Sequence, residues 1–341
     1  MNIFEFSKKA GVSTATVSRA FHEPEKVLDA TRIHVLSLAD QLGYYPNASG
    51  RALVRGRHDV LGLIWPLEVE GVEAFFAHRI LAAVTSHLVK LDLDLLICPV
   101  DRRLDSTLSH AHRTLMRSRC DSWILLYPRR NDVLISSLEK SGKPVVCLMG
   151  SIPECPTWKC INLNQQSWIE DALQRMKAAG CRKVLLFGSR FGEPDHEERV
   201  AVFLKFAPEY FGSQVRSIPG WPPDADRLHH ELSSGNCDAI IGVDDDAALF
   251  ALDVCLRAGL SVPDQVKVVG IDNIPEAQFS SPPLTTYRQP LDEMTECAIE
   301  LTLSTQMRSR VFDAVFVPRK SLPSACSPVA REAGKSGFTF L

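Results

Sequence analysis

The chain lacks the features that would place it in or beyond a membrane. Its 341 residues contain no run of about 18 apolar residues, the length that a membrane-spanning helix needs. The N-terminus has no basic stretch followed by an apolar one, which is the layout of a secretory signal. We therefore expect a cytoplasmic protein that neither spans a membrane nor is secreted.

Signals of catalysis and of metal binding are missing as well. The sequence has no nucleophile motif, no glycine-rich phosphate loop and no histidine cluster at metal-binding spacing. Its ten cysteines form no Cys-x-x-Cys pair, and the nearest two, Cys155 and Cys160, have no second pair at zinc spacing. Cys98, Cys147 and Cys255 lie in apolar runs, where free cysteine behaves as a small hydrophobe. We predict that the chain is not an enzyme and that it binds neither a cofactor nor a metal. We expect its cysteines to be reduced, and the question whether they sense redox state stays open.

No excess of one charge marks the chain as a whole, since its net charge is −3. The charge is unevenly distributed. Residues 1–58 hold eight basic and five acidic residues, and the rest holds 30 basic and 36 acidic residues. A small basic head on an acidic body is typical of a DNA-binding protein whose body stays away from the phosphates, although chance surface asymmetry is the alternative.

What the sequence does contain begins with two short helices within residues 3–22. Apolar residues recur at helical spacing, namely Ile3, Phe6 and Ala10 in the first stretch and Val17 and Phe21 in the second. Gly11 can end the first helix, and Ser13 can cap the start of the second. This layout predicts a helix-turn-helix, although other helical corners containing a glycine look similar.

The outward face of the second helix carries short polar groups and one guanidinium, from Thr14, Ala15, Ser18 and Arg19. Such a face fits a major groove, where arginine reads guanine and small side chains contact thymine methyls or phosphates. The alternative is an ordinary solvated helix face. A third amphipathic helix is predicted over residues 27–42 and ends at Gly43.

Fixed spacings through this region identify a resemblance to the LacI/GalR family of bacterial repressors. The matching residues are Ala10-Gly11-Val12-Ser13, Thr16-Val17-Ser18-Arg19, Thr31-Arg32, Leu42-Gly43-Tyr44, Pro46-Asn47 and Arg51-Ala52-Leu53. The resemblance implies base reading by Thr14, Ala15 and Arg19. It implies DNA-backbone contacts from Ser7, Ser13, Thr16, Ser18 and Tyr45. His22 stands where the family usually has asparagine, which puts a contact there in doubt.

The same resemblance implies a hinge helix over residues 47–57 that folds on DNA. Leu53 would enter the minor groove there, with Arg51 beside it, and a plain linker is the alternative. Gly50 replaces the family's usual alanine, which weakens the helix. The partner would be a near-palindromic double-stranded operator, bound by a homodimer.

From Val60 onward, apolar strands alternate with helices, which favours parallel α/β sheets covered on both faces. We predict strands at residues 60–65, 93–99, 122–126 and 144–148, and then at 183–188, 215–218, 239–242 and 267–271. Two such sets predict two lobes with a ligand cleft between them. The family resemblance implies that this body is periplasmic-binding-protein-like. The expected fold class is therefore an all-α helix-turn-helix headpiece (residues 1–46) plus an α/β periplasmic-binding-protein-like body of two doubly wound parallel-sheet lobes (residues 58–341). We place the first lobe at 58–161 plus 288–320, and the second at 162–287 plus 321–341.

The resemblance continues in the body, through Val268-Val269-Gly270-Ile271-Asp272 and Ser281-Pro282-Pro283-Leu284-Thr285-Thr286. It implies that a small-molecule effector bound between the lobes modulates operator affinity. The implied effector-binding residues are Phe75, Phe76, Arg199, Trp221, Asp244 and Asp272. A sugar or related polyol is favoured because the two carboxylates would repel phosphate, although Arg190 and Arg199 leave an anionic ligand open.

Alternatives remain for this cleft and for the chain. Trp221 could be a core residue, and Asp244-Asp245-Asp246 could be a helix N-cap cluster. The rival function is a solute-receptor-like binding protein without specific DNA affinity. Repressor action is the family default.

Overall fold

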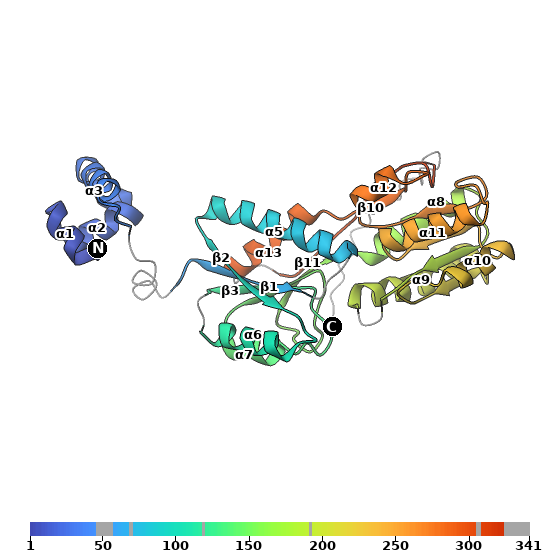
Figure 1. Cartoon of the computed structure of the whole chain (residues 1–341), viewed down its shortest axis with the longest axis horizontal. Helices are drawn as coiled ribbons and strands as arrows, with labels where there is room; N and C mark the ends of the chain where they lie inside the picture. Colours follow the sequence, from blue (N-terminus) through green and yellow to red (C-terminus); the bar gives the residue numbers. More distant parts are fainter. Residues whose placement is uncertain (46–56, 68–70, 118–119, 191–192, 305–307, 324–341) are drawn as a thin grey trace.

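The computed structural model describes residues 1–45, 57–67, 71–117, 120–190, 193–304 and 308–323. A three-helix headpiece precedes a body built on two parallel sheets (Figure 1). The predicted fold class is confirmed. Among these residues, no helix combines the length and the apolar character needed to cross a bilayer.

The headpiece contains α1 (Ile3–Ala10), α2 (Thr14–His22), a 3-10 turn (Pro24–Lys26) and α3 (Asp29–Leu42). Gly11 ends α1 with a left-handed φ of 67°, as predicted. The Ser13 hydroxyl caps α2 by accepting a hydrogen bond from the Thr16 amide at 3.1 Å. The third helix starts at Asp29 rather than at residue 27, because the 3-10 turn takes up the residues before it.

The headpiece has its own apolar core, formed by the buried side chains of Phe6, Ala10, Val17, Ala20, Val35, Ala39 and Tyr44. The Phe6 and Tyr44 rings stack with centroids 4.1 Å apart. Two apolar residues of α3 lie outside this core, since Ile33 is 67% exposed and Leu42 is 39% exposed. The headpiece core is small, so α3 covers it with only the face that carries Val35 and Ala39.

The first lobe is a six-stranded parallel sheet in the order β11-β5-β4-β3-β1-β2. Its strands are β1 (Val60–Pro66), β2 (Asp94–Val100), β3 (Ser122–Leu126), β4 (Val145–Leu148), β5 (Lys159–Leu163) and β11 (Arg310–Phe312). One face is covered by α5 (Gly71–Leu91) and α13 (Leu291–Leu303), and the other by α6 (Asp105–Arg117) and α7 (Ile135–Ser141) (Figure 1). The cysteines that we expected to be buried here, Cys98 and Cys147, are buried and free.

The second lobe is a four-stranded parallel sheet in the order β7-β6-β8-β9. Its strands are β6 (Val184–Phe187), β7 (Val215–Ile218), β8 (Ala239–Gly242) and β9 (Lys267–Val269). The helices around it are α8 (Gln165–Ala178), α9 (Pro194–Phe211), α10 (Ala225–Ser233), α11 (Asp245–Arg257) and α12 (Pro275–Phe279). Cys255, in α11, is buried and free as predicted.

The chain crosses between the lobes three times, after β5, after β10 (Thr286–Arg288) and after β11. The third crossing corrects the predicted lobe boundary. Residues 313–320 were placed in the first lobe, but β12 (Val315–Val317) pairs antiparallel with β10, beside the second lobe. Asn164 joins the first crossing to the third. Its backbone N–H donates to the Phe312 carbonyl, and its side-chain amide donates to the Asp313 carboxylate.

Candidate DNA-reading surface and effector cleft

The α2 helix presents the side chains predicted to read bases. Ala15, Ser18 and Arg19 are exposed and Thr14 is half-buried, whereas Val17 and Ala20 on the opposite side are buried in the headpiece core. The Ser13 and Thr16 hydroxyls lie 2.9 Å apart at the start of the helix. A rigidly packed helix therefore carries one guanidinium and several small groups on its free face.

The predicted DNA-backbone contacts divide into two kinds. Ser18 is exposed and Tyr45 is 77% exposed, so both are accessible to a phosphate. Ser7 is buried and its hydroxyl donates to the Phe4 carbonyl at 3.0 Å, which counts against a contact from this side chain. Arg51 and Leu53, predicted for the minor groove, lie outside the described residues.

A small hollow lies where the two lobes meet, and four of the six predicted effector residues line it: Phe76, Arg199, Asp244 and Asp272. Its volume is about 10 Å³, which is room for about one water molecule. Phe75 packs against Phe76, with ring centroids 5.7 Å apart. Trp221 is absent from the lining and is 41% exposed.

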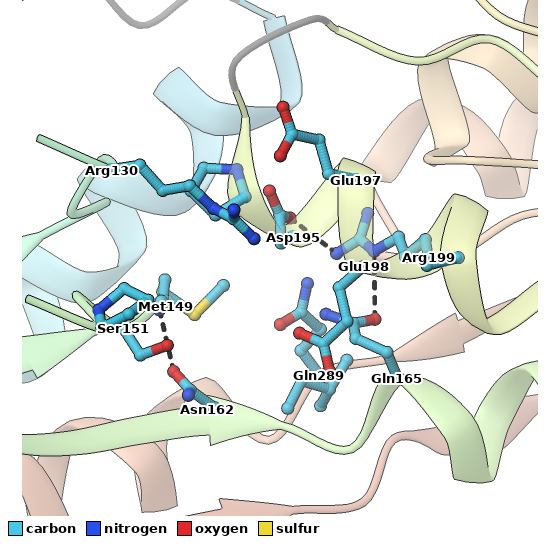
Figure 2. Close-up of a pocket in the computed structure, with 15 residues that line it drawn as sticks. Arg130, Met149, Ser151, Asn162, Gln165, Asp195, Glu197, Glu198, Arg199 and Gln289 are labelled. Atoms are coloured by element: carbon cyan, nitrogen blue, oxygen red, sulfur yellow. Dashed lines mark hydrogen bonds and ion pairs between the residues drawn. The ribbon is translucent and has the colours of Figure 1, made fainter. Parts of the chain in front are cut away.

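A larger cavity of about 480 Å³ adjoins this hollow and shares Met149, Asp195, Arg199 and Gln289 with it. Figure 2 shows Arg130, Met149 and Ser151 of the first lobe facing the start of α9, with Asn162 from β5 and Gln165 from the start of α8 on either side of the first crossing. The lining mixes carboxylates, guanidinium groups and amides. Such a surface suits a polar ligand with many hydroxyl groups.

Arg199 organises this cleft from a fully buried position. Its guanidinium donates to the Val243 carbonyl at 2.8 Å and to Gln165 at 3.1 Å, and lies 3.0 Å from Asp195 (Figure 2). Burial raises the pKa of Asp195, but the charge of Arg199, together with smaller contributions from His196 and from backbone hydrogen bonds, outweighs this effect and holds that pKa below its ordinary value. The arginine is therefore held by three partners before any ligand arrives.

Two buried carboxyl groups of the second lobe, Asp272 in the lining of the hollow and Asp245 at the start of α11, are pushed toward their neutral forms. Burial raises the pKa of Asp272 well above its ordinary value, and Gln289 donates to this side chain at 2.6 Å. Burial likewise raises the pKa of Asp245 to about 8. Asp245 accepts hydrogen bonds from the Thr286 hydroxyl at 2.6 Å and from the Ile274 amide at 3.0 Å. Both groups thus tie the second lobe to the second crossing.

Asp245→Asn is expected to flatten the pH dependence of the body's stability. The ordinary pKa of 3.8 applies to the unfolded chain and a pKa of about 8 to the folded one, so the folded state holds a proton that the unfolded state releases. Stability is therefore lost as the pH rises through this window. From about pH 6 to about pH 7, we expect the wild-type free energy of unfolding to fall by about 1 kcal/mol relative to the variant.

Urea unfolding followed by tryptophan fluorescence measures this difference, because all five tryptophans lie in the body. The variant also loses one acceptor for Thr286 or Ile274, but that offset does not vary with pH. Parallel curves for the two proteins across the window would contradict the prediction.

Several residues that line the cleft were not predicted from the sequence to be site residues. Gln289 and Asp195 line both spaces, and His196 lines the smaller one. The signal for Asp195 was its i,i+4 spacing to Arg199 on one helix. Gln289 lies in the stretch that resembles the family, but no binding role was assigned to it, because that role arises from its contact with Asp272 across the segment after β10.

The lobes are also joined outside the cavities. Arg129, after β3, lies 3.1 Å from Glu193 at the start of α9. Behind it, Arg102 and Asp132 form an almost fully buried pair at 2.9 Å. Across the part of the chain that the structure describes, no group of three or more His, Cys, Asp or Glu side chains is placed to hold a metal ion.

Comparison with known families gives two matches along the chain. Residues 2–47 match the family described as bacterial regulatory proteins, lacI family. Residues 173–331 match the periplasmic binding protein-like domain. The matches fall on the headpiece and on the second half of the body.

Similar proteins have both parts. The transcriptional repressor PurR of Aliivibrio salmonicida is 26% identical over 313 residues, covering 88% of this chain and 91% of the relative. The transcriptional regulator GalR of Salmonella typhimurium is 27% identical over 334 residues, covering 94% and 95% of the two chains.

Solved structures share the fold over nearly the whole length. The lac repressor dimer bound to operator and the anti-inducer ONPF has a TM-score of 0.78 at 21% identity, covering 95% of this chain and 99% of that one. The complex of the transcriptional regulator CelR with cellobiose has a TM-score of 0.66 at 23% identity, covering 94% and 99%.

Proposed function

Because the chain belongs to the lacI family of bacterial regulatory proteins, we propose that it is a repressor that binds an operator as a homodimer and responds to a sugar or related polyol. The chain is a DNA-binding transcription regulator and not an enzyme. The observation that carries the proposal is the α2 helix, which is packed from behind by Val17 and Ala20 and presents Thr14, Ala15 and Arg19 outward.

Two copies would place their α2 helices in successive major grooves of a near-palindromic site. Arg19 would donate to guanine, and Thr14 and Ala15 would contact neighbouring base edges. Leu53, with Arg51, would open the minor groove at the centre of the site. The protein would act where bacterial DNA is found, in the cytoplasm.

The effector would bind between the lobes, where the 480 Å³ cavity meets the small hollow. Arg199 and Asp272 would contact its hydroxyl groups, and Phe76 with Phe75 would face its apolar side. Binding would change how far the lobes close, and thereby the spacing of the two headpieces. Effector and operator affinity are then linked reciprocally, typically by about 1–3 kcal/mol. CelR bound to cellobiose supports a saccharide in this class of cleft.

The test is selection of sites from random duplex DNA by the full-length chain, followed by titration of the selected site with neutral sugars, sugar phosphates and nucleosides. We expect a near-palindromic site whose affinity shifts with a neutral sugar. No enriched site, together with sugar binding, would favour the solute-receptor alternative. A stronger response to a sugar phosphate would overturn the choice of a neutral sugar.

A further inference from the structure

Arg190 lies in the place where the sequence led us to expect a ligand. Its guanidinium carbon is 4.1 Å from the centroid of the Trp221 ring. Its terminal nitrogens lie 3.1 Å from Asp244 and 3.5 Å from Asp246. Two residues predicted to bind the effector, the tryptophan and the first aspartate, are thus engaged by an arginine of the chain itself.

The backbone holds this arrangement in register. Ser189 and Gly220 form an antiparallel bridge, with the Ser189 amide donating to the Gly220 carbonyl at 3.4 Å. Arg190 and Trp221 each follow a bridged residue on antiparallel segments, so they lie diagonally across the bridge, within reach of a long side chain and an aromatic ring. The Arg190 amide also donates to His196 at 3.0 Å, which ties the segment to α9.

Asp244 is almost completely buried, and its two oxygens have different tasks. Oδ1 caps α11 by accepting from the Ala247 amide at 2.7 Å, and Oδ2 accepts from Arg190. The side chain of Arg190 is 15% exposed and lines the small hollow, which has a volume of about 10 Å³. A sugar ring therefore has no room there while the guanidinium stays in place.

We infer that Arg190 is a built-in occupant of the subsite formed by Trp221, Asp244 and Asp246, and that the effector binds by displacing it. The inference rests on the proposed effector site. Arg190 then determines specificity. A successful ligand must supply hydrogen-bond donors to Asp244 Oδ2 and an apolar ring face to Trp221, the two features that a pyranose presents. An anionic group would meet Asp244 after it has lost the guanidinium of Arg190.

The consequence is a lowered apparent affinity for every ligand that needs the subsite. Ligand binds only the fraction of molecules whose arginine has moved out, and the apparent dissociation constant rises by the inverse of that fraction. Removing the guanidinium should abolish this competition. It should also leave a vacant site whose walls, one ring and two carboxylates, suit a small planar cation.

The experiment is calorimetric titration of the full-length chain, Arg190→Ala and Arg190→Gln with methylguanidinium chloride. We expect Arg190→Ala to bind one methylguanidinium with a dissociation constant of about 1–10 mM, in keeping with so few heavy atoms. The wild-type chain should bind none there. Arg216→Ala is the matched control in the same lobe, since it removes an arginine that pairs with Glu231 at the exposed surface.

The same proteins are then titrated with D-galactose, cellobiose and sucrose. A sugar that binds the wild-type chain should bind Arg190→Ala about tenfold more tightly if the arginine is out in about a tenth of molecules. Methylguanidinium should compete with that sugar in the variant.

Tryptophan fluorescence establishes whether each variant is folded. If Arg190→Ala is not folded, Arg190→Gln takes its place in both titrations. A folded variant that takes up no methylguanidinium, or that binds the sugar no more tightly than wild type, overturns the inference. Failure of the proposed function would show separately, as the absence of an operator selected by the unsubstituted chain.

Discussion

Replacing Arg199 with leucine is expected to lower the free energy of unfolding of the body by about 3–5 kcal/mol, the usual effect of breaking a buried ion pair on one side. Leucine fills part of the volume but leaves the Val243 carbonyl and Gln165 without their donor. It also leaves Asp195 without its ion-pair partner at 3.0 Å. Nearby Asp272, whose pKa burial already raises, loses the positive charge that opposes the shift.

Arg257 provides a matched control for this measurement. It pairs with Asp253 at 2.8 Å, with the same i,i+4 spacing on a helix, but its side chain is 78% exposed. Arg257→Leu should therefore change the free energy of unfolding by less than about 1 kcal/mol. Urea unfolding followed by tryptophan fluorescence compares the two. If the two variants lose equal free energies of unfolding, the Arg199–Asp195 pair contributes no more to stability than a surface ion pair does.

Arg19→Ala is expected to remove about 1–3 kcal/mol of discrimination between the operator and random DNA. The side chain is exposed on α2 and contributes nothing to the headpiece core, so the fold should be kept. Affinity for non-specific DNA should fall far less, because it depends on the whole set of phosphate contacts. Binding titrations at several salt concentrations, on the selected operator and on a scrambled duplex, measure both quantities.

Arg19→Lys separates charge from geometry in this experiment. Lysine keeps the positive charge but lacks the planar fork that pairs with guanine in two places. We expect it to keep the salt dependence of wild type and to lose most of the discrimination. If the lysine variant discriminates as well as wild type, Arg19 acts on phosphate and not on a base.

The headpiece could be predicted because its structure is encoded locally. Gly11 stops one helix and Ser13 starts the next, and each does so through atoms within a few residues along the chain. The side of α3 that faces the core could not be fixed in this way. Ile33 and Leu42 fit the apolar pattern but are exposed, because the helix packs through Val35 and Ala39.

The body shows the same division between local and long-range information. The predicted strand 122–126 matches β3, and 215–218 and 239–242 match β7 and β8, since buried parallel strands are nearly continuous apolar runs. The short strands β5, β10, β11 and β12 were missed. Each depends on a neighbour far along the chain, as when β11 pairs with β5 or β12 with β10.

The effector cleft was predicted in composition but not in arrangement. Phe76, Arg199, Asp244 and Asp272 were identified by resemblance, and the structure brings them to one hollow. That Arg190 covers Trp221, and that Gln289 reaches Asp272, depends on contacts between segments distant in sequence.

By itself, the sequence determined the helix-turn-helix, the two-lobed parallel body and the family, because caps, glycines and apolar runs act over short distances. Only the tertiary structure decided the lobe boundary after Phe312, the burial of Ser7 and the occupant of the tryptophan subsite. Those features depend on which distant side chains share a space, and this is settled by packing and by the pairing of buried charges.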